Sequence, residues 1–228
     1  MSDPAASAPR RPAVWVNCAA SLDGRLAFAG GRRAALSSPE DLVRVQRLRA
    51  NADAILVGVG TVVADDPSLR VHWDLLGEPP GREPTRVVVD ASGRTPGHAR
   101  VLAGGTPTIV ATSEENVRSY PAHVIVMRAG HGSVDLTLLF EQLYAHGTHR
   151  LLVEGGAQVL ASVLREGLFD RLTIYYAPLV IGGTTAPPVA RGPETLDLES
   201  AVRLRFESTE TVGAGYVATY RPVRPGLS

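Results

Sequence analysis

The sequence predicts an α/β fold with a mostly parallel central sheet, flanked by helices and completed by a C-terminal antiparallel hairpin. Short apolar runs rich in valine and isoleucine recur along the chain, as is typical of strands buried on both faces of a parallel sheet. Segments with the apolar spacing of helices lie between some of these runs. The expected strands are Ala13–Ala19, Ala54–Val59, Arg86–Val89, Thr108–Ala111, His123–Met127 and Leu151–Val153.

Three helices are expected from their end signals. Ser38-Pro39-Glu40-Asp41 combines a capping hydroxyl, a proline at the first helical position and acids near the positive end of the helix dipole. The later helices carry apolar residues on one face and end at glycines. The expected helices run from Ser38 to about Ala50, from just after Asp135 to Gly147, and from just after Gly156 to near Gly167.

The C-terminal part of the sequence predicts strands without helices between them. Arg171–Ile181 is expected as one long strand, and Val202–Thr211 and Tyr216–Arg221 flank a glycine-containing turn, which predicts a terminal hairpin. Strands that alternate with helices and then a hairpin favour a mostly parallel sheet with an antiparallel edge. Gly77–Pro84 is expected as a surface loop.

The length of 228 residues permits one large domain or two small ones, and the lack of an internal linker favours one. A hydrophobic content of 44% is enough for a sizeable core. We expect a disordered tail over residues 1–11, rich in Ala, Ser and Pro, and a single domain over residues 12–222. The tail has no apolar signal-peptide segment, and no apolar run could span a bilayer, so the cytoplasm is the expected compartment.

Charge and cysteine content exclude several function classes. The 23 basic residues balance the 23 acidic ones, which argues against a nucleic-acid or membrane partner but permits a local basic pocket for a phosphorylated small molecule. Cys18 is the single cysteine, so the chain forms neither an internal disulfide nor a cysteine-rich zinc site. No metal site is expected.

Four polar segments follow the ends of predicted strands, where open α/β sheets bind ligands. In the segment Ser21–Arg25, Ser21 and Asp23 could offer hydrogen bonds to a polar ligand, or Asp23 could simply hold a turn with Gly24. In the segment Val57–Pro67, Thr61 and Asp65 are four residues apart and would share one face of a helical turn. The alternative for that acidic stretch is a solvated turn. The four segments are Ser21–Arg25, Val57–Pro67, Val88–Arg94 and Leu152–Gln158.

The other two segments have features of phosphate-binding loops. Ala91-Ser92-Gly93-Arg94 combines small residues with a guanidinium, although an ordinary turn would look similar. Gly155 and Gly156 precede a helix whose free N–H groups suit a pyrophosphate, but the dinucleotide-binding fingerprint is not matched. Glu154 ends an apolar strand and therefore should lie at a pocket.

Several segments in this order resemble the 2,5-diamino-6-ribosylamino-pyrimidinone 5′-phosphate reductases of archaea and fungi, and the reductase domain of the bacterial bifunctional riboflavin-pathway deaminase/reductase. The likeness spans about Val14 to Tyr220. It implies a dihydrofolate reductase-like fold, NADPH as cofactor and a homodimer. The zinc motif of the deaminase has no counterpart here. The segments are Asn17–Arg25, Arg47–Ala50, Gly58–Val62, Ala64–Pro67, Val87–Asp90 and Glu154–Gly156.

The resemblance also implies roles for individual residues. Asp65 and Asp23 are both candidates for the catalytic carboxylate that stabilises a protonated iminium. Arg94, with Arg128 or His131, could surround the 2′-phosphate of NADPH. The implied cofactor-binding residues are Thr61, Asp65, Ala91, Ser92, Gly93, Arg94, Gly155, Gly156, Ala157 and Gln158. The implied substrate-binding residues are Asn17, Ser21, Asp23, Arg49, His72 and Glu154, with Arg49 as the phosphate ligand and Glu154 as the acceptor for ring N–H groups.

Two positions depart from the bacterial pattern, in which lysine usually replaces Asn17 and arginine often replaces His72. Because asparagine both donates and accepts whereas lysine only donates, Asn17 favours a different substituent on the pyrimidine, such as the amino group present before deamination. Both pyrimidines remain open as substrates. The rival functions are another NADPH reductase of this fold, such as a dihydrofolate reductase, and a nucleotide-binding module without turnover.

Overall fold

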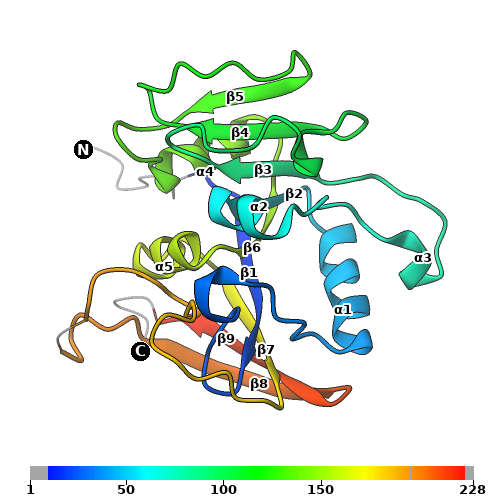
Figure 1. The fold of residues 1–228 in the computed structure, drawn as a ribbon, viewed down its shortest axis with the longest axis vertical. Helices are drawn as coiled ribbons and strands as arrows, with labels where there is room; N and C mark the ends of the chain where they lie inside the picture. Colours follow the sequence, from blue (N-terminus) through cyan, green and yellow to red (C-terminus); the bar gives the residue numbers. More distant parts are fainter. Residues whose placement is uncertain (1–9, 196, 224–228) are drawn as a thin grey trace, which may run out of the picture.

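The computed structural model describes residues 10–195 and 197–223, so most of the expected tail lies outside the described residues. Within them, one nine-stranded sheet has the order β5-β4-β3-β2-β6-β1-β7-β9-β8 (Figure 1). Strands β1 to β7 pair in parallel, and β9 and β8 extend the sheet as an antiparallel hairpin. The expected fold class is confirmed. The strands are β1 (Ala13–Ser21), β2 (Ala54–Gly58), β3 (Thr85–Val89), β4 (Thr108–Thr112), β5 (Val124–Arg128), β6 (Arg150–Gly155), β7 (Arg171–Ala177), β8 (Leu204–Val212) and β9 (Gly215–Pro222).

The three expected helices form at their end signals. The Ser38 hydroxyl accepts a hydrogen bond from the Asp41 amide, and the Asp135 carboxylate accepts one from the Leu138 amide. The helices that begin at Pro39 and Leu136 therefore each have a side-chain cap. No helix of the described chain is long and apolar enough to cross a membrane. The helices are α1 (Pro39–Ala50), α2 (Val59–Asp65), α3 (Trp73–Leu76), α4 (Leu136–Ala145) and α5 (Ala157–Arg165), with short 3-10 turns at Ala29–Gly31 and Arg100–Leu102.

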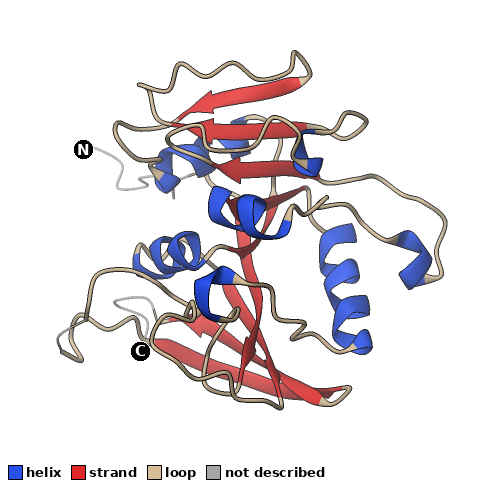
Figure 2. Ribbon diagram, viewed as in Figure 1, coloured by secondary structure: helices blue, strands red, loops and turns tan. Residues whose placement is uncertain are grey.

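The parallel strands are buried on both faces, and each face has its own core. Leu56 and Val87 pack with Phe140 of α4 on one face. Their neighbours along the strands, Ile55 and Val88, pack in the other cluster, because successive side chains of a strand point to opposite faces. Figure 2 shows the helices set around the sheet, and in Figure 1 α1 and α5 lie on opposite sides of β1 and β6.

The segment after β6 fixes how closely α5 approaches its neighbours. A Cβ atom at Gly58 would lie 2.9 Å from the Val159 side chain, so glycine permits β2 and α5 to pack together. Gly156 has a φ of 62° and a ψ of 130°, a conformation that side chains other than glycine rarely adopt. These two glycines bring the start of α5 next to the start of α2.

Two expectations about the elements are wrong. The strand expected over Ala54–Val59 stops at Gly58. The segment that follows was expected as a helical turn or a solvated turn, and Val59–Asp65 forms the complete helix α2, which ends where Asp66 adopts a left-handed conformation with a φ of 41°. The strand expected over Arg171–Ile181 stops at Ala177. Pro178 follows, and proline lacks the N–H that a sheet needs. The amides of Ile181 and Gly182 then bind the Asp23 carboxylate instead of a strand.

Arg11 lies within the segment expected as a tail. Its guanidinium donates to both carboxylate oxygens of Asp170, at 2.8 and 2.9 Å. Asp170 also accepts from the Val14 amide at 2.9 Å. The chain is therefore joined to the start of β7 from Arg11 onward.

Candidate active site

A cavity of about 560 Å³ lies where β1, β2, β3 and β6 end. Ligands of open α/β sheets bind at this edge, and the strand order here departs from the chain order, which marks the usual crevice. Most of the residues expected to hold a cofactor line it, and so does Glu154. Those residues are Thr61, Asp65, Ala91, Ser92, Arg94, Gly155, Gly156, Ala157 and Gln158.

The wall formed by α2 and α5 is built largely from backbone. The N-terminal end of α5 lies at the cavity, and Ala157, the first residue of this helix, lines the cavity. A Cβ atom at Gly156 would lie 3.4 Å from the Thr61 hydroxyl, so a side chain there would crowd the wall. Free N–H groups and the positive end of a helix dipole bind phosphate groups well. This wall therefore suits a pyrophosphate.

A buried carboxylate holds the loop after β3. Asp90 accepts hydrogen bonds from the amides of Arg94 and Thr95 at 2.8 and 2.7 Å, and from the Thr95 hydroxyl at 2.6 Å. Arg94 is thereby held on the cavity wall. Gly93 does not line the cavity, and it turns the loop with a φ of 71°. Asp90 lies within the predicted polar segment Val88–Arg94, but no role was predicted for it, although its position at the end of an apolar strand was the available signal.

Two residues expected to bind substrate bind each other. Arg49 donates from Nε and Nη2 to the two carboxylate oxygens of Glu154, at 2.7 and 2.6 Å. Arg49 Nη1 also donates to the Arg70 carbonyl at 3.0 Å. The Arg49 and Glu154 side chains are only 15% and 9% exposed, so this is a nearly buried, bidentate ion pair. From the sequence, ring N–H groups were the expected partners of Glu154, and a phosphate was the expected partner of Arg49.

The two candidate catalytic carboxylates differ in environment. Asp23 accepts from the Ser21 hydroxyl at 2.7 Å and from the amides of Ile181 and Gly182, which hold its pKa down at about 2. Asp65 lines the cavity, and desolvation raises its pKa despite the opposing charge of Arg33. Asp65 therefore retains a proton more readily than Asp23, which is committed to anchoring a loop.

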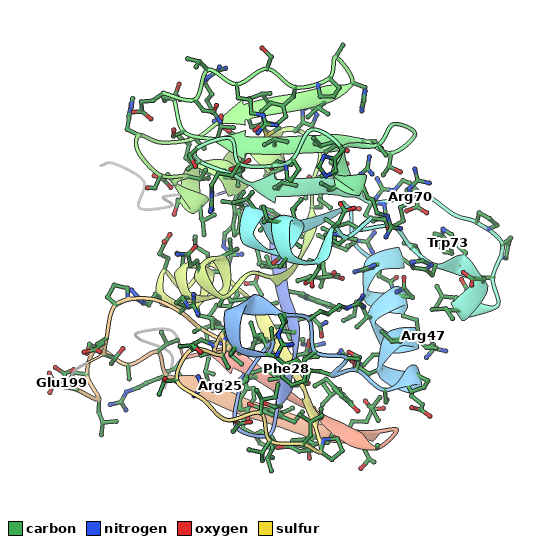
Figure 3. All side chains as sticks on the ribbon, in the orientation of Figure 1. Arg25, Phe28, Arg47, Arg70, Trp73 and Glu199 are labelled. Carbon is green, nitrogen blue, oxygen red and sulfur yellow. The ribbon has the colours of Figure 1, made fainter. Side chains whose placement is uncertain are left out.

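The remaining expected substrate residues lie in different places. Asn17 and Ser21 are buried and do not line the cavity. Asn17 accepts from Arg44 of α1 and Thr173 of β7. His72 lies in a separate hollow of about 660 Å³, with Arg70 and Trp73, which are labelled in Figure 3. The structure thus keeps His72 apart from the cavity that holds Glu154.

Some cavity residues were not predicted from the sequence. Arg191 lines the cavity, and its amide donates to the Ala157 carbonyl at 2.9 Å, which joins the loop after β7 to the start of α5. Cys18 also lines it, but burial raises the pKa of its thiol to about 12 and keeps the group neutral. Of the three cations expected near a 2′-phosphate, Arg94 lines the cavity. Arg128 donates to Asn116, and His131 pairs with Glu115, and neither lines it.

Two archaeal proteins are similar to this chain over almost its whole length. A protein named 2,5-diamino-6-ribosylamino-4(3H)-pyrimidinone 5′-phosphate reductase from Methanothermobacter thermautotrophicus is 41% identical over 214 residues, which cover 92% of this chain and 98% of that protein. A protein of the same name from Archaeoglobus fulgidus is 42% identical over 220 residues, with the same coverage. The likeness therefore extends over almost the whole of both proteins.

Solved structures agree on the fold. Acinetobacter baumannii RibD superposes with a TM-score of 0.79 at 25% identity, over 94% of this chain and 59% of that one. The Saccharomyces riboflavin biosynthesis reductase Rib7 superposes with a TM-score of 0.73 at 23% identity, over 95% and 92% of the two chains. These likenesses confirm the expected dihydrofolate reductase-like fold. The model of the RibD C-terminal domain matches residues 12–218, and the chain therefore belongs to the RibD C-terminal domain family.

Proposed function

We propose that this protein is an oxidoreductase of riboflavin biosynthesis that reduces the ribose of a 5-amino-6-(ribosylamino)pyrimidine 5′-phosphate to the ribityl form, with NADPH as the electron donor. The archaeal relatives carry the name of this reductase. The observation that carries the proposal is the joint construction of the cavity. A helix start and glycine-rich wall suited to a pyrophosphate faces the same space as Glu154 and Asp65.

The residues present fit a nicotinamide dinucleotide. The cavity volume of about 560 Å³ is within the usual range for ligand sites. The start of α5 offers N–H groups to a pyrophosphate, and Thr61 lies beside it on α2. Arg94 and Arg191 are the cations of the wall, and a guanidinium binds a phosphate in a bidentate manner. NADPH carries a 2′-phosphate that NADH lacks, so a guanidinium on this wall supports NADPH over NADH.

The reduction needs a hydride at carbon and a proton at nitrogen. The ribosylamine opens to an imine at the first sugar carbon, and NADPH, when bound, would supply the hydride to that carbon. The imine nitrogen takes a proton as its double bond becomes a single bond. Asp65 is the residue that we assign to hold this proton, because desolvation raises its pKa and it lines the cavity. Glu154 binds and orients the substrate, and Arg49 holds the Glu154 carboxylate in place.

The test measures NADPH oxidation with three substrates: the diamino pyrimidine 5′-phosphate, its deaminated form and dihydrofolate. We expect oxidation with at least one pyrimidine and none with dihydrofolate, and a higher catalytic efficiency with NADPH than with NADH. Turnover of dihydrofolate alone would favour the rival reductase. Tight NADPH binding without oxidation by any of the three would favour a nucleotide-binding module.

We also propose that the protein is a homodimer. The edge strand β8 exposes 57% of Phe206, and Trp15 of β1 is 40% exposed with the Arg171 guanidinium over its ring. An uncovered strand edge with exposed aromatic side chains favours pairing with a second copy. Sedimentation equilibrium should give twice the mass of one chain at micromolar concentration, and the mass of a single chain would contradict the proposal.

A further inference from the structure

Two arginine side chains line the candidate active site without partners of their own. Arg94 and Arg191 are both exposed there, and neither guanidinium forms a hydrogen bond or an ion pair with any residue that the structure describes. Two other arginines close to the cavity are already paired, Arg25 with Asp23 and Arg49 with Glu154. A guanidinium left free at a cavity is available to an anionic group of a ligand.

Backbone hydrogen bonds hold the loop that carries Arg191 on two sides. On one side, the Arg191 amide donates to the Ala157 carbonyl at 2.9 Å. On the other side, the Val189 amide donates to the Gly24 carbonyl at 3.1 Å. Residues 189–191 therefore cross from the loop after β1 to the first residue of α5. This crossing places Arg191 beside the start of α5, on the wall that suits a pyrophosphate.

The two free arginines come from separate parts of the sheet edge. Arg94 follows β3, and Asp90 holds its amide, whereas Arg191 lies beside the helix that follows β6. Strand β2 lies between β3 and β6, so these two strands are two strand spacings apart, about 10 Å. Loops separated in this way suit two phosphate groups better than one. NADPH carries two such groups, the pyrophosphate and the 2′-phosphate of its adenosine.

We propose that Arg191 is a cofactor-binding residue whose guanidinium binds the pyrophosphate of the dinucleotide, so that it strengthens the binding of NADPH and of NADH equally. This inference rests on the proposed function and specifies how the same cavity holds its cofactor. Both dinucleotides carry the pyrophosphate, whereas only NADPH carries the 2′-phosphate. The division leaves Arg94, on the separate loop after β3, as the arginine that distinguishes the two cofactors.

The test measures affinity and not turnover, with ligands that carry one or both phosphate groups. NADPH and NADH are titrated by fluorescence. ADP, which has a diphosphate but no 2′-phosphate, and adenosine 2′-monophosphate, which has the reverse, are measured by competition with NADPH. The melting temperature and the affinity for the pyrimidine substrate are measured on the same preparations.

The variants are Arg191→Met, Arg191→Lys, the comparison Arg94→Met and the control Arg47→Met. Arg191→Met removes the guanidinium but keeps the backbone amide that joins the loop to α5, so the fold should be retained. Arg191→Lys keeps the charge but loses the bidentate geometry. Arg47 is exposed on α1, does not line the cavity and is labelled in Figure 3, so its replacement controls for the loss of one positive charge.

We expect Arg191→Met to weaken NADPH and NADH by the same factor, about tenfold, as the loss of a hydrogen bond to a charged group does. ADP should weaken with them, and adenosine 2′-monophosphate should not. Arg191→Lys should lie between Arg191→Met and wild type. Arg94→Met should show the reverse pattern, with losses for NADPH and adenosine 2′-monophosphate only. Arg47→Met should bind all four ligands as wild type does.

Three results for Arg191→Met would overturn this inference alone. Unchanged affinity for both dinucleotides would remove Arg191 from the site, and a loss confined to NADPH would assign it to the 2′-phosphate. A lower melting temperature with an equal loss of pyrimidine affinity would make Arg191 a structural residue. Wild type that binds NADPH but reduces no pyrimidine would instead overturn the proposed function, and wild type that binds neither dinucleotide would overturn both.

Discussion

The two walls of the candidate active site are built in different ways. The wall from α2, α5 and the loop after β3 consists of glycines, small polar residues and helix-start amides, which leave groups free for a ligand. On the α1 side, Glu154 lines the cavity, and behind it lie charged side chains that are already bound to one another, as in Arg49–Glu154 and Arg44–Asp41. One side of the cavity binds mainly through backbone, whereas the other is preorganised by ion pairs behind it.

This difference determines what a substitution does. Side-chain changes on the backbone wall should have small effects unless they add atoms where glycine is required. A change to one partner of an ion pair leaves the other partner charged and nearly buried, which costs stability as well as binding. Substitutions on the α1 side should therefore produce the largest effects.

The largest effect is expected for Arg49→Met. It leaves the Glu154 carboxylate, only 9% exposed, without its bidentate partner. Breaking a buried pair in this way costs about 3–5 kcal/mol of the free energy of unfolding. Urea denaturation should show this loss, together with a strong decrease in kcat/KM. The control Arg47→Met should change stability by about 0.5 kcal/mol or less, as exposed substitutions do. A loss below about 1 kcal/mol for Arg49→Met would mean that the pair is no stronger than a surface pair.

Glu154→Gln tests substrate recognition with less damage to the fold. Glutamine keeps the shape of Glu154 and one acceptor oxygen for Arg49, but it removes the charge and replaces the other acceptor oxygen with a donor, which would face the ring N–H groups of the pyrimidine. The loss of a hydrogen bond to a charged group costs about 1.5–3 kcal/mol, which corresponds to roughly tenfold to over a hundredfold in kcat/KM. NADPH affinity, measured by fluorescence titration, should change little. A lowered melting temperature with an unchanged kcat/KM would restrict Glu154 to its structural pair with Arg49.

Local signals made most of the fold predictable. The cap at Ser38 and the apolar strand runs act within a few residues, and the structure contains the corresponding helix and strands at nearly the expected bounds. The extent of α2 was not predicted, because Gly58 and Gly60 at its start are more typical of a loop than of a helix. The early end of β7 depends on Asp23, whose contacts with Ile181 and Gly182 join residues that are distant in the sequence.

Only part of the cavity lining was predictable from the sequence, and its connections were not. Residues at or just after strand ends, such as Glu154 and Thr61, could be placed at a cavity because polar groups there need a ligand or solvent. The pairing of Glu154 with Arg49 could not be read from the sequence, since it joins positions 105 residues apart. The same holds for Asn17, whose orientation depends on the contact with Arg44 across the sheet–helix interface.

Gly156→Ala tests the backbone wall. Gly156 adopts a φ of 62° and a ψ of 130°, and a non-glycine residue held in such a conformation costs about 1–3 kcal/mol. The added Cβ atom would also lie 3.4 Å from the Thr61 hydroxyl. We expect a lower melting temperature and weaker NADPH binding, with little change in pyrimidine affinity. The control is Gly97→Ala, where an added Cβ meets no atom within 4 Å. Equal effects of both variants would contradict the special role of this turn.

The smallest effect is a shift of pH dependence in Arg33→Met. Desolvation raises the pKa of Asp65, and the positive charge of Arg33 opposes that rise. If protonated Asp65 supplies the proton, activity is present below its pKa and lost as the pH increases through it. Removing the Arg33 charge should raise the pKa further, so the decline of kcat should move to higher pH. In Asp65→Asn this decline should disappear, together with most of the activity. A shift of the decline to lower pH in Arg33→Met, or an unchanged decline in Asp65→Asn, would assign the proton to another group.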